Sequence, residues 1–201
     1  MTITYTYGGN LYVNMTNKCS NNCIFCIRNN NNGVYGSDSL WLEREPSKEE
    51  VRDDILKYDL SVFKQLVFCG YGEPTERIYD LIWVAAEIKK IYNIKVRINT
   101  NGHANLINKE DVTPLFNNVI DVVSVSLNAV SAVEYEKICN PEFGIESYNG
   151  MLDFTKKVKD FVGEVFLSVV RGTIPDDDIP LCQTIAENAG VKFRIREMEQ
   201  I

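Results

Sequence analysis

Three cysteines lie close together in the segment Cys19-Ser20-Asn21-Asn22-Cys23-Ile24-Phe25-Cys26. Thiolates bind zinc and iron–sulfur clusters, and C-x-x-C pairs also carry out thiol redox chemistry. A closed structural zinc site needs about four ligands. No second cysteine pair or histidine pair completes one, because His103 is the single histidine. Three thiolates on one loop instead suit an iron–sulfur cluster in which one iron has no protein ligand.

Other interpretations of this motif explain less. Positions 19, 23 and 26 have the spacing of one helix face, but the intervening Ser-Asn-Asn favours turns over a helix interior. A thioredoxin-like pair would use Cys23 and Cys26 at a helix start and would not need Cys19. Three disulfides are disfavoured, because the other cysteines are scattered and no export signal is visible.

The remaining cysteines and the histidine are expected to lie outside the chemistry. Cys69 is expected as a small buried hydrophobe at a strand end, and Cys182 on the buried side of a helix. Cys139 is expected in a loop from which it could approach a substrate. His103 follows a turn and is expected to be a solvated loop residue.

A second motif, Gly70-Tyr71-Gly72-Glu73-Pro74, follows an apolar run directly. Taken alone, it would be a tight turn into a helix, with Pro74 near the first turn. Glycine also lets a backbone approach a ligand closely, and the carboxylate of Glu73 can accept a charge-assisted hydrogen bond from an ammonium group.

Polar residues follow the later apolar runs as well. They are Thr100 and Asn101 after one run, Ser126 and Asn128 after the next, Arg171 after a third, and Glu197 and Glu199 after the last. Asn101-Gly102 is a turn dipeptide in any context, so turn chemistry alone would account for it. The guanidinium of Arg171 suits a carboxylate of cofactor or substrate, although a solvated loop residue is the alternative.

The elements that would position these residues alternate between strand and helix. The expected strands are 11–15, 65–69, 95–100, 122–127, 165–170 and 192–196, and the expected helices are 49–58, 77–92, a short one at 111–117, 148–162 and 179–189. Such alternation implies parallel strands with right-handed crossovers. A complete eight-unit barrel needs about 250 residues. We therefore expect an α/β fold, a partial (β/α)6 TIM-like barrel of parallel strands, as one domain over 1–201.

Composition narrows the class of protein further. The chain has 201 residues, 45% of them hydrophobic and 24% charged, as in ordinary globular domains. The net charge of −7 argues against general nucleic-acid binding. No apolar run is long enough to cross a bilayer, and no secretory signal is visible, so we expect a cytoplasmic protein without a membrane partner.

Together the two motifs resemble those of the radical SAM superfamily, in which C-x3-C-x2-C is the signature. The resemblance implies that Cys19, Cys23 and Cys26 hold a [4Fe–4S] cluster. It further implies that the open iron binds S-adenosylmethionine, and that an electron from the cluster cleaves it to methionine and a 5′-deoxyadenosyl radical. That radical would abstract hydrogen from a substrate.

The resemblance also implies roles for the other candidates. Phe25 matches the aromatic residue near the adenine, and the segment 70–74 matches the G-G-E-P motif that holds the amino group, with Tyr71 in place of a glycine. Thr100, Asn101, Ser126 and Asn128 match segments that contact the ribose and carboxylate. Asn128 replaces a commoner aspartate and brings no charge.

More than one assignment is compatible with these motifs. Within the superfamily the chain is similar to a small group associated with TatD-type nucleases, which share G-Y-G-E-P-T, as at 70–75. The alternatives are an activase of glycyl-radical enzymes, a deazapurine-type biosynthetic enzyme, or, from another class, a non-catalytic iron–sulfur module that senses redox state or binds a partner. An enzyme of this type would need an electron donor such as flavodoxin or ferredoxin, and a partial barrel is compatible with a protein or peptide substrate.

Overall fold

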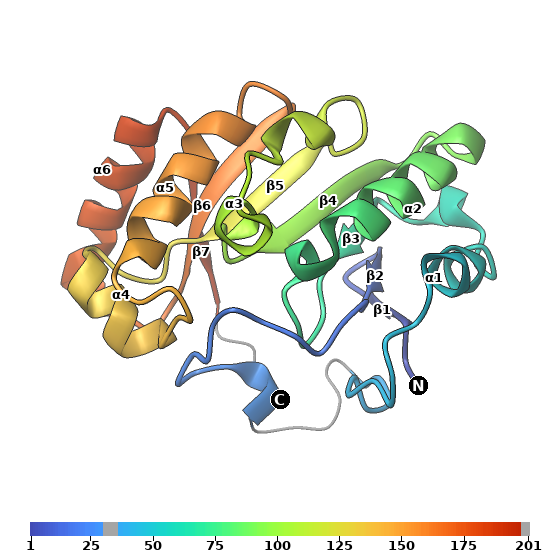
Figure 1. The fold of residues 1–201 in the computed structure, drawn as a ribbon, viewed down its shortest axis with the longest axis horizontal. Coiled ribbons are helices and arrows are strands. Elements are labelled where there is room, and N and C mark those ends of the chain that lie inside the picture. The colour runs from blue at the N-terminus through green and yellow to red at the C-terminus, as the bar shows by residue number, and fades with distance from the viewer. Residues whose placement is uncertain (30–35, 198–201) are drawn as a thin grey trace.

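A single twisted sheet forms the centre of the computed structural model, which describes residues 1–29 and 36–197. The strands are β1 (Thr4–Tyr7), β2 (Asn10–Val13), β3 (Gln65–Phe68), β4 (Lys95–Thr100), β5 (Val122–Ser126), β6 (Glu164–Val170) and β7 (Lys192–Arg196). They lie side by side in sequence order, and every neighbouring pair from β2 onward is parallel (Figure 1). The two ends of the sheet do not pair with each other, which confirms the expected partial barrel.

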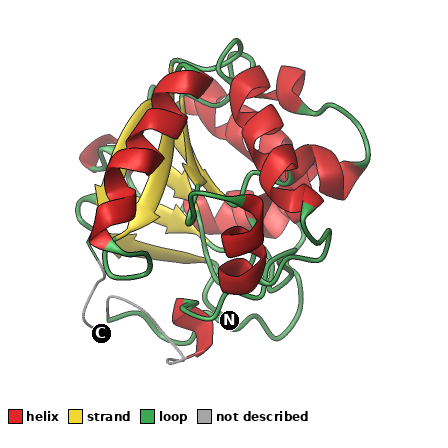
Figure 2. Ribbon diagram, turned by 90° about the vertical axis from the view of Figure 1, so that its left-hand side faces the viewer, coloured by secondary structure: helices red, strands yellow, loops and turns green. Residues whose placement is uncertain are grey.

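Helices connect the parallel strands and cover one face of the sheet (Figures 1 and 2). They are α1 (Lys48–Ile55), α2 (Ile78–Ile91), α3 (Ala104–Asn108), α4 (Ala132–Cys139), α5 (Glu146–Val158) and α6 (Ile179–Ala189). The 3-10 turns are η1 (Ile27–Asn29), η2 (Leu60–Val62), η3 (Pro74–Arg77), η4 (Thr113–Phe116) and η5 (Asp176–Asp178). Ser47 and Glu50 form a capping box at the start of α1. No described helix is long and apolar enough to cross a membrane.

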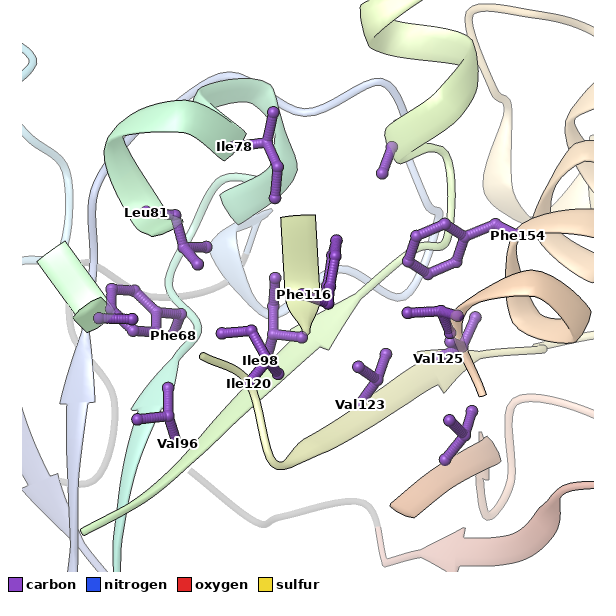
Figure 3. Close-up of a cluster of buried hydrophobic side chains, with 14 of the residues drawn as sticks. Phe68, Ile78, Leu81, Val96, Ile98, Phe116, Ile120, Val123, Val125 and Phe154 are labelled. Atoms are coloured by element: carbon purple, nitrogen blue, oxygen red, sulfur yellow. The ribbon is translucent and has the colours of Figure 1, made fainter. Parts of the chain in front are cut away.

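The main core lies between the sheet and the helices. Alternate residues of the strands, such as Val96 and Ile98 of β4 and Val123 and Val125 of β5, are completely buried on this side (Figure 3). Ile98 and Val123 are direct partners in the β4–β5 ladder, so the register places their side chains next to each other. The core therefore fixes which face of every strand is turned away from the helices.

The sequence-based expectations missed three elements. Thr4–Tyr7 pairs antiparallel with β2, so the sheet has a seventh strand that is not parallel to the rest. Gly8 and Gly9 form the two-residue turn of this hairpin, with φ values of 57° and 78°. Helices α3 and α4 were also missed, because each is short and follows a turn sequence. The helix expected at 111–117 is only the 3-10 turn η4.

Candidate functional site

The segment 19–26, here called the cysteine loop, follows β2 and is held against the end of α4. The Asn22 amide donates to the Cys139 carbonyl at 2.9 Å, and the Ile24 amide donates to the Ile138 carbonyl at 3.0 Å. Figure 1 shows this blue segment reaching beneath α4. A turn closes the loop, in which the Cys26 amide donates to the Cys23 carbonyl at 3.2 Å. The three cysteines are therefore on a loop and not on a helix face.

The thiols of the cysteine loop are half-buried, and their pKa values are raised, which favours the protonated form. Burial and the negative charge of Glu73 raise the pKa of Cys19 to about 12. A hydrogen bond with the Cys139 thiol, followed by burial, raises the pKa of Cys23, and burial raises that of Cys26. Thiols bind metal as thiolates, so a cation bound here would displace their protons.

The donor set suits an iron–sulfur cluster in number and chemistry, with three thiols on one loop and no competing fourth ligand in the motif. Within the described ranges, no three His, Cys, Asp or Glu side chains are grouped closely enough to hold a metal ion. The three cysteines therefore share one loop, but their side chains do not lie close enough together to hold a metal ion. The Cys23 thiol is hydrogen-bonded to Cys139. Binding a cluster would require these side chains to turn together.

Cys139 differs from its expected position. It is the last residue of α4, completely buried, and not a loop residue open to substrate. The Asn128 side-chain amide donates to its Sγ atom at 3.5 Å, and its thiol bonds Cys23. Cys139 therefore contacts the cysteine loop and helps to support it.

The two glycines of the 70–74 motif are required by close packing against the chain itself. A Cβ atom on Gly70 would lie 2.1 Å from Asn14 Oδ1, and one on Gly72 would lie 2.3 Å from the Thr16 carbonyl oxygen. The neighbouring Glu73 amide donates to the Lys18 carbonyl at 2.7 Å. The glycines therefore let this loop dock onto the segment leading to the cysteine loop, a packing role beside the predicted approach of a ligand.

Glu73 joins the loops that follow β3 and β4. Its Oε1 atom accepts from the Thr75 amide at 3.0 Å and from the hydroxyls of Thr75 and Thr100, each at 2.7 Å. Its Oε2 atom accepts from the Asn101 amide at 2.7 Å. Burial raises the pKa of this carboxyl, and the four hydrogen bonds act in the opposite direction. Oε2, with one bond of this set, keeps capacity to accept another donor such as an ammonium.

Asn101 connects the β4 loop to the cysteine loop. Its side-chain amide donates to Ser20 Oγ at 2.9 Å and lies 4.0 Å from Cys19 Sγ. Its Oδ1 atom accepts from the His103 amide at 3.0 Å. The predicted residues Glu73, Thr100 and Asn101 therefore do come together, directly beside Cys19.

His103 was expected in solvent and is instead completely buried. Its Nδ1 atom lies 3.1 Å from Ser20 Oγ, and its Nε2 atom lies 3.2 Å from the Tyr135 hydroxyl, which also accepts from Asn21 Nδ2 at 2.9 Å. Burial lowers the pKa of His103 to about 4, so the ring is neutral at pH 7. Sequence reasoning missed His103 and Tyr135 as supports of the cysteine loop, because their contacts span 83 and 114 residues along the chain.

The two candidates at the end of β5, Ser126 and Asn128, have different hydrogen-bond partners. Asn128 is buried with φ of 58°, a left-handed conformation that asparagine tolerates. Its amide nitrogen donates to Cys139, while its buried Oδ1 atom has no hydrogen-bond partner in the part of the chain that the structure describes. Ser126 Oγ accepts from Arg196 Nη2 at 3.3 Å. Asn128 thus offers an acceptor next to the supports of the cysteine loop.

Three other candidates lie apart from this network. Phe25 is half-buried in the cysteine loop, and Tyr71 is buried 5.2 Å from the Trp41 ring in a small aromatic cluster. Arg171 is exposed and pairs with Glu197 at 3.1 Å. The structure does not bring Arg171 to the cysteine loop, and Glu199 lies outside the described residues.

The last two cysteines lie near their expected positions. Cys182 is completely buried in α6, as predicted. Cys69, directly after β3, is half-buried and packs against the aromatic cluster around Tyr71. Neither thiol belongs to the cysteine loop.

Comparison with known proteins decides the family. The family model described as "Radical SAM superfamily" matches residues 13–181, which include the cysteine loop and the 70–74 motif. The chain belongs to the radical SAM superfamily. Members of this superfamily are enzymes that typically use a 4Fe–4S cluster and S-adenosylmethionine.

The individual relatives have low sequence identity to this chain. The chain is 25% identical over 192 residues to a protein of Thermococcus kodakarensis described as a probable GTP 3′,8-cyclase, covering 94% of this chain and 57% of that one. It is 23% identical over 172 residues to an uncharacterized protein of Methanocaldococcus jannaschii, covering 83% and 49%. The crystal structure of Streptococcus suis SuiB bound to precursor peptide SuiA is similar in fold, with a TM-score of 0.71, 13% identity and coverage of 98% and 40%. The chain thus spans about half the length of these curated relatives.

Proposed function

We propose that this chain binds a [4Fe–4S] cluster through Cys19, Cys23 and Cys26 and cleaves S-adenosylmethionine reductively, so that hydrogen is abstracted from a substrate. The observation that carries the proposal is the junction of three strand-end loops. Glu73 bonds the Asn101 amide at 2.7 Å, and Asn101 bonds Ser20, next to Cys19, at 2.9 Å. A ligand held at this junction would touch all three loops at one edge of the parallel sheet.

The chain's own residues have distinct tasks in this proposal. The cluster, when bound, supplies the electron and an iron open to the cofactor. Glu73 Oε2 is available to accept from the cofactor's ammonium, and Asn128 Oδ1 from a ribose hydroxyl. Phe25, Gly70, Tyr71, Gly72, Thr100, Ser126 and Arg171 stay predicted cofactor contacts, of which the exposed Arg171 would have to leave Glu197.

The substrate and partners belong to the proposal as well. The likeness to a probable GTP 3′,8-cyclase supports including nucleoside triphosphates in a substrate screen, and the likeness to a peptide-bound structure supports including peptides. We further propose a flavodoxin- or ferredoxin-type reductant, a cytoplasmic location and one radical SAM core domain over 1–201. Membership of the TatD-associated group and the activase and deazapurine-type alternatives stay predictions.

Metal content and cofactor binding test the proposal. Protein reconstituted anaerobically with iron and sulfide should hold about four irons, and S-adenosylmethionine should change the electron paramagnetic resonance signal of the reduced cluster. Arg44→Gln is a suitable control, because Arg44 is exposed and pairs with Glu50. Stoichiometric zinc without iron, in protein made with both metals available, would contradict the proposal. An iron–sulfur signal that the cofactor leaves unchanged would favour the non-catalytic module.

A further inference from the structure

The sheet face turned away from the main core carries several arginines. On β4, Val96 and Ile98 point into the core, which leaves Arg97 on the opposite face, here called the inner face. On β7, Ile195 packs against the core, so Arg194 and Arg196 lie on the inner face too. All three arginines are half-buried.

These arginines converge although their strands are not neighbours. Strands β5 and β6 lie between β4 and β7, yet the charge of Arg97 acts on Arg194, whose pKa is lowered by burial and by this charge. Arg196 reaches Ser126 of β5 at 3.3 Å, and Arg97 reaches the Tyr12 hydroxyl of β2 at 3.2 Å. The sheet curls enough to direct side chains from four strands toward one region.

Two of these arginines, Arg97 and Arg194, have no acidic partner close enough to neutralise them among the described residues. Among residues 1–29 and 36–197, no carboxylate lies within salt-bridge distance of Arg97 or Arg194. Glu164 is the acidic residue acting on Arg194, and its Oε1 atom binds Lys192 at 3.3 Å. The buried Nε atom of Arg97 has no hydrogen-bond partner in the described residues. Such a group is costly to bury unless a ligand completes its hydrogen bonds.

Two structural explanations cover only part of this pattern. Charged side chains on an edge strand discourage pairing with other chains, which would explain Arg194 and Arg196 on β7. Solvation of an open sheet face would explain fully exposed cations. Neither explains Arg97, which lies on the central strand β4 with a buried Nε atom.

We propose that Arg97, Arg194 and Arg196 bind a carboxylate or phosphate group of the substrate, beside the rings of Tyr12 and Phe166. Guanidinium groups recognise either anion through paired N–H donors, and Phe166 already stacks under Arg194 at 3.9 Å. This inference rests on the proposed function, since it names the substrate class of the same site.

The position of this anion site relative to the proposed chemistry follows from Cys69. Burial raises the pKa of this thiol, whereas a hydrogen bond with the Asn99 side chain and, to a smaller extent, the charges of Arg196 and Arg97 lower it. Cys69 directly precedes Gly70 of the 70–74 motif. The arginines therefore lie within electrostatic reach of the strand ends where the cofactor is proposed to bind.

Calorimetric titration of the cluster-loaded protein, with S-adenosylmethionine present, tests the proposal. The probes are inorganic pyrophosphate for a phosphate ligand and glutarate for a carboxylate ligand. Arg97→Gln and Arg194→Gln should each weaken the better probe about tenfold or more, as expected when a charge-assisted hydrogen bond is lost. Arg44→Gln removes the same charge from an exposed ion pair and should leave the affinity within about twofold.

The outcomes separate this inference from the proposed function. Binding of either probe that depends on both arginines supports the site and identifies the anion. No binding of either probe, or equal binding by the glutamine variants, would overturn it. Loss of the cofactor-induced resonance change in Arg97→Gln would also overturn it, because the arginines would then hold the cofactor.

Two further results remain informative. The chain could bind a probe through the arginines and yet not bind S-adenosylmethionine. That result would contradict the proposed function and still support the anion site. Should the glutamine variants fail to fold, Arg97→Lys and Arg194→Lys keep the charge and lose the paired donors. These variants should weaken the probe severalfold, and unchanged affinity in both would count against the site.

Discussion

At the scale of single residues, the cysteines differ in role despite similar chemistry. Cys19, Cys23 and Cys26 share one loop, whereas Cys139 supports that loop from the end of α4. Changing any of the first three to alanine should abolish iron binding, because the cluster loses a ligand. Cys139→Ala, Cys69→Ala and Cys182→Ala should retain about four irons in the same assay. Iron loss in Cys139→Ala equal to that in Cys23→Ala would mean that the ligand set is wrong.

Glu73 is expected to matter for folding as well as for the cofactor. Glu73→Ala removes the acceptor of four hydrogen bonds and leaves the Thr100 hydroxyl and the Asn101 amide buried without it. The free energy of unfolding should fall by about 1–3 kcal/mol. Urea unfolding measures this, with Glu142→Ala, an exposed glutamate outside the junction, as control. Equal stability of the two variants would show that Glu73 does not hold the loops together.

The buried histidine predicts a pH dependence of stability. Its pKa is about 4 in the folded chain and about 6.5 when unfolded. A lowered pKa means that the unfolded chain binds the proton more strongly. Stability is therefore complete above about pH 6.5 and falls as the pH drops toward 4, by up to about 3 kcal/mol.

Urea unfolding of the cluster-free chain between pH 7.5 and 4.5 should show this loss. His103→Gln should flatten the dependence in that window, although its stability at pH 7.5 is lower because the bond to Ser20 or Tyr135 is lost. If the free energy of unfolding falls as steeply with pH in the variant as in the wild-type chain, groups other than His103 cause the dependence.

At the scale of elements, the glycine loop and the cysteine loop form one unit. Gly72→Ala would place a Cβ atom 2.3 Å from a backbone oxygen, and a backbone contact cannot be relieved by a side-chain rotation. We expect a loss of about 1–3 kcal/mol in unfolding free energy and impaired cluster loading. Gly163→Ala is the matched control, because its nearest contact is 3.4 Å away. Normal loading in Gly72→Ala would contradict the docking role of this glycine.

The strands that carry the site were largely predictable from sequence, while its supporting contacts were not. Compact apolar runs identified β4 within its observed bounds of Lys95–Thr100, since burial on one face leaves a visible pattern. The strand-end position of Glu73 and Asn101 followed from that alternation. The contacts of His103 with Ser20 and Tyr135 could not follow, because they depend on how distant loops pack in three dimensions.

At the scale of the whole molecule, one sheet separates two environments. The helix-covered face is an apolar core that fixes the register, and the inner face carries Arg97, Arg194 and Arg196. The cysteine loop lies at the edge where both environments end, supported by α4 and by the loops after β3 and β4. In the proposed function, the cofactor would therefore bind beside a face whose arginines bind the substrate.

Product analysis tests the central claim most directly. The reconstituted protein, reduced in the presence of S-adenosylmethionine, should release 5′-deoxyadenosine and methionine, slowly alone and faster with a substrate. Asn128→Ala should lower the yield without changing the iron content, because Asn128 offers a buried acceptor and is not a ligand. A full, reducible cluster that binds the cofactor but yields no 5′-deoxyadenosine with any substrate mixture would contradict the account.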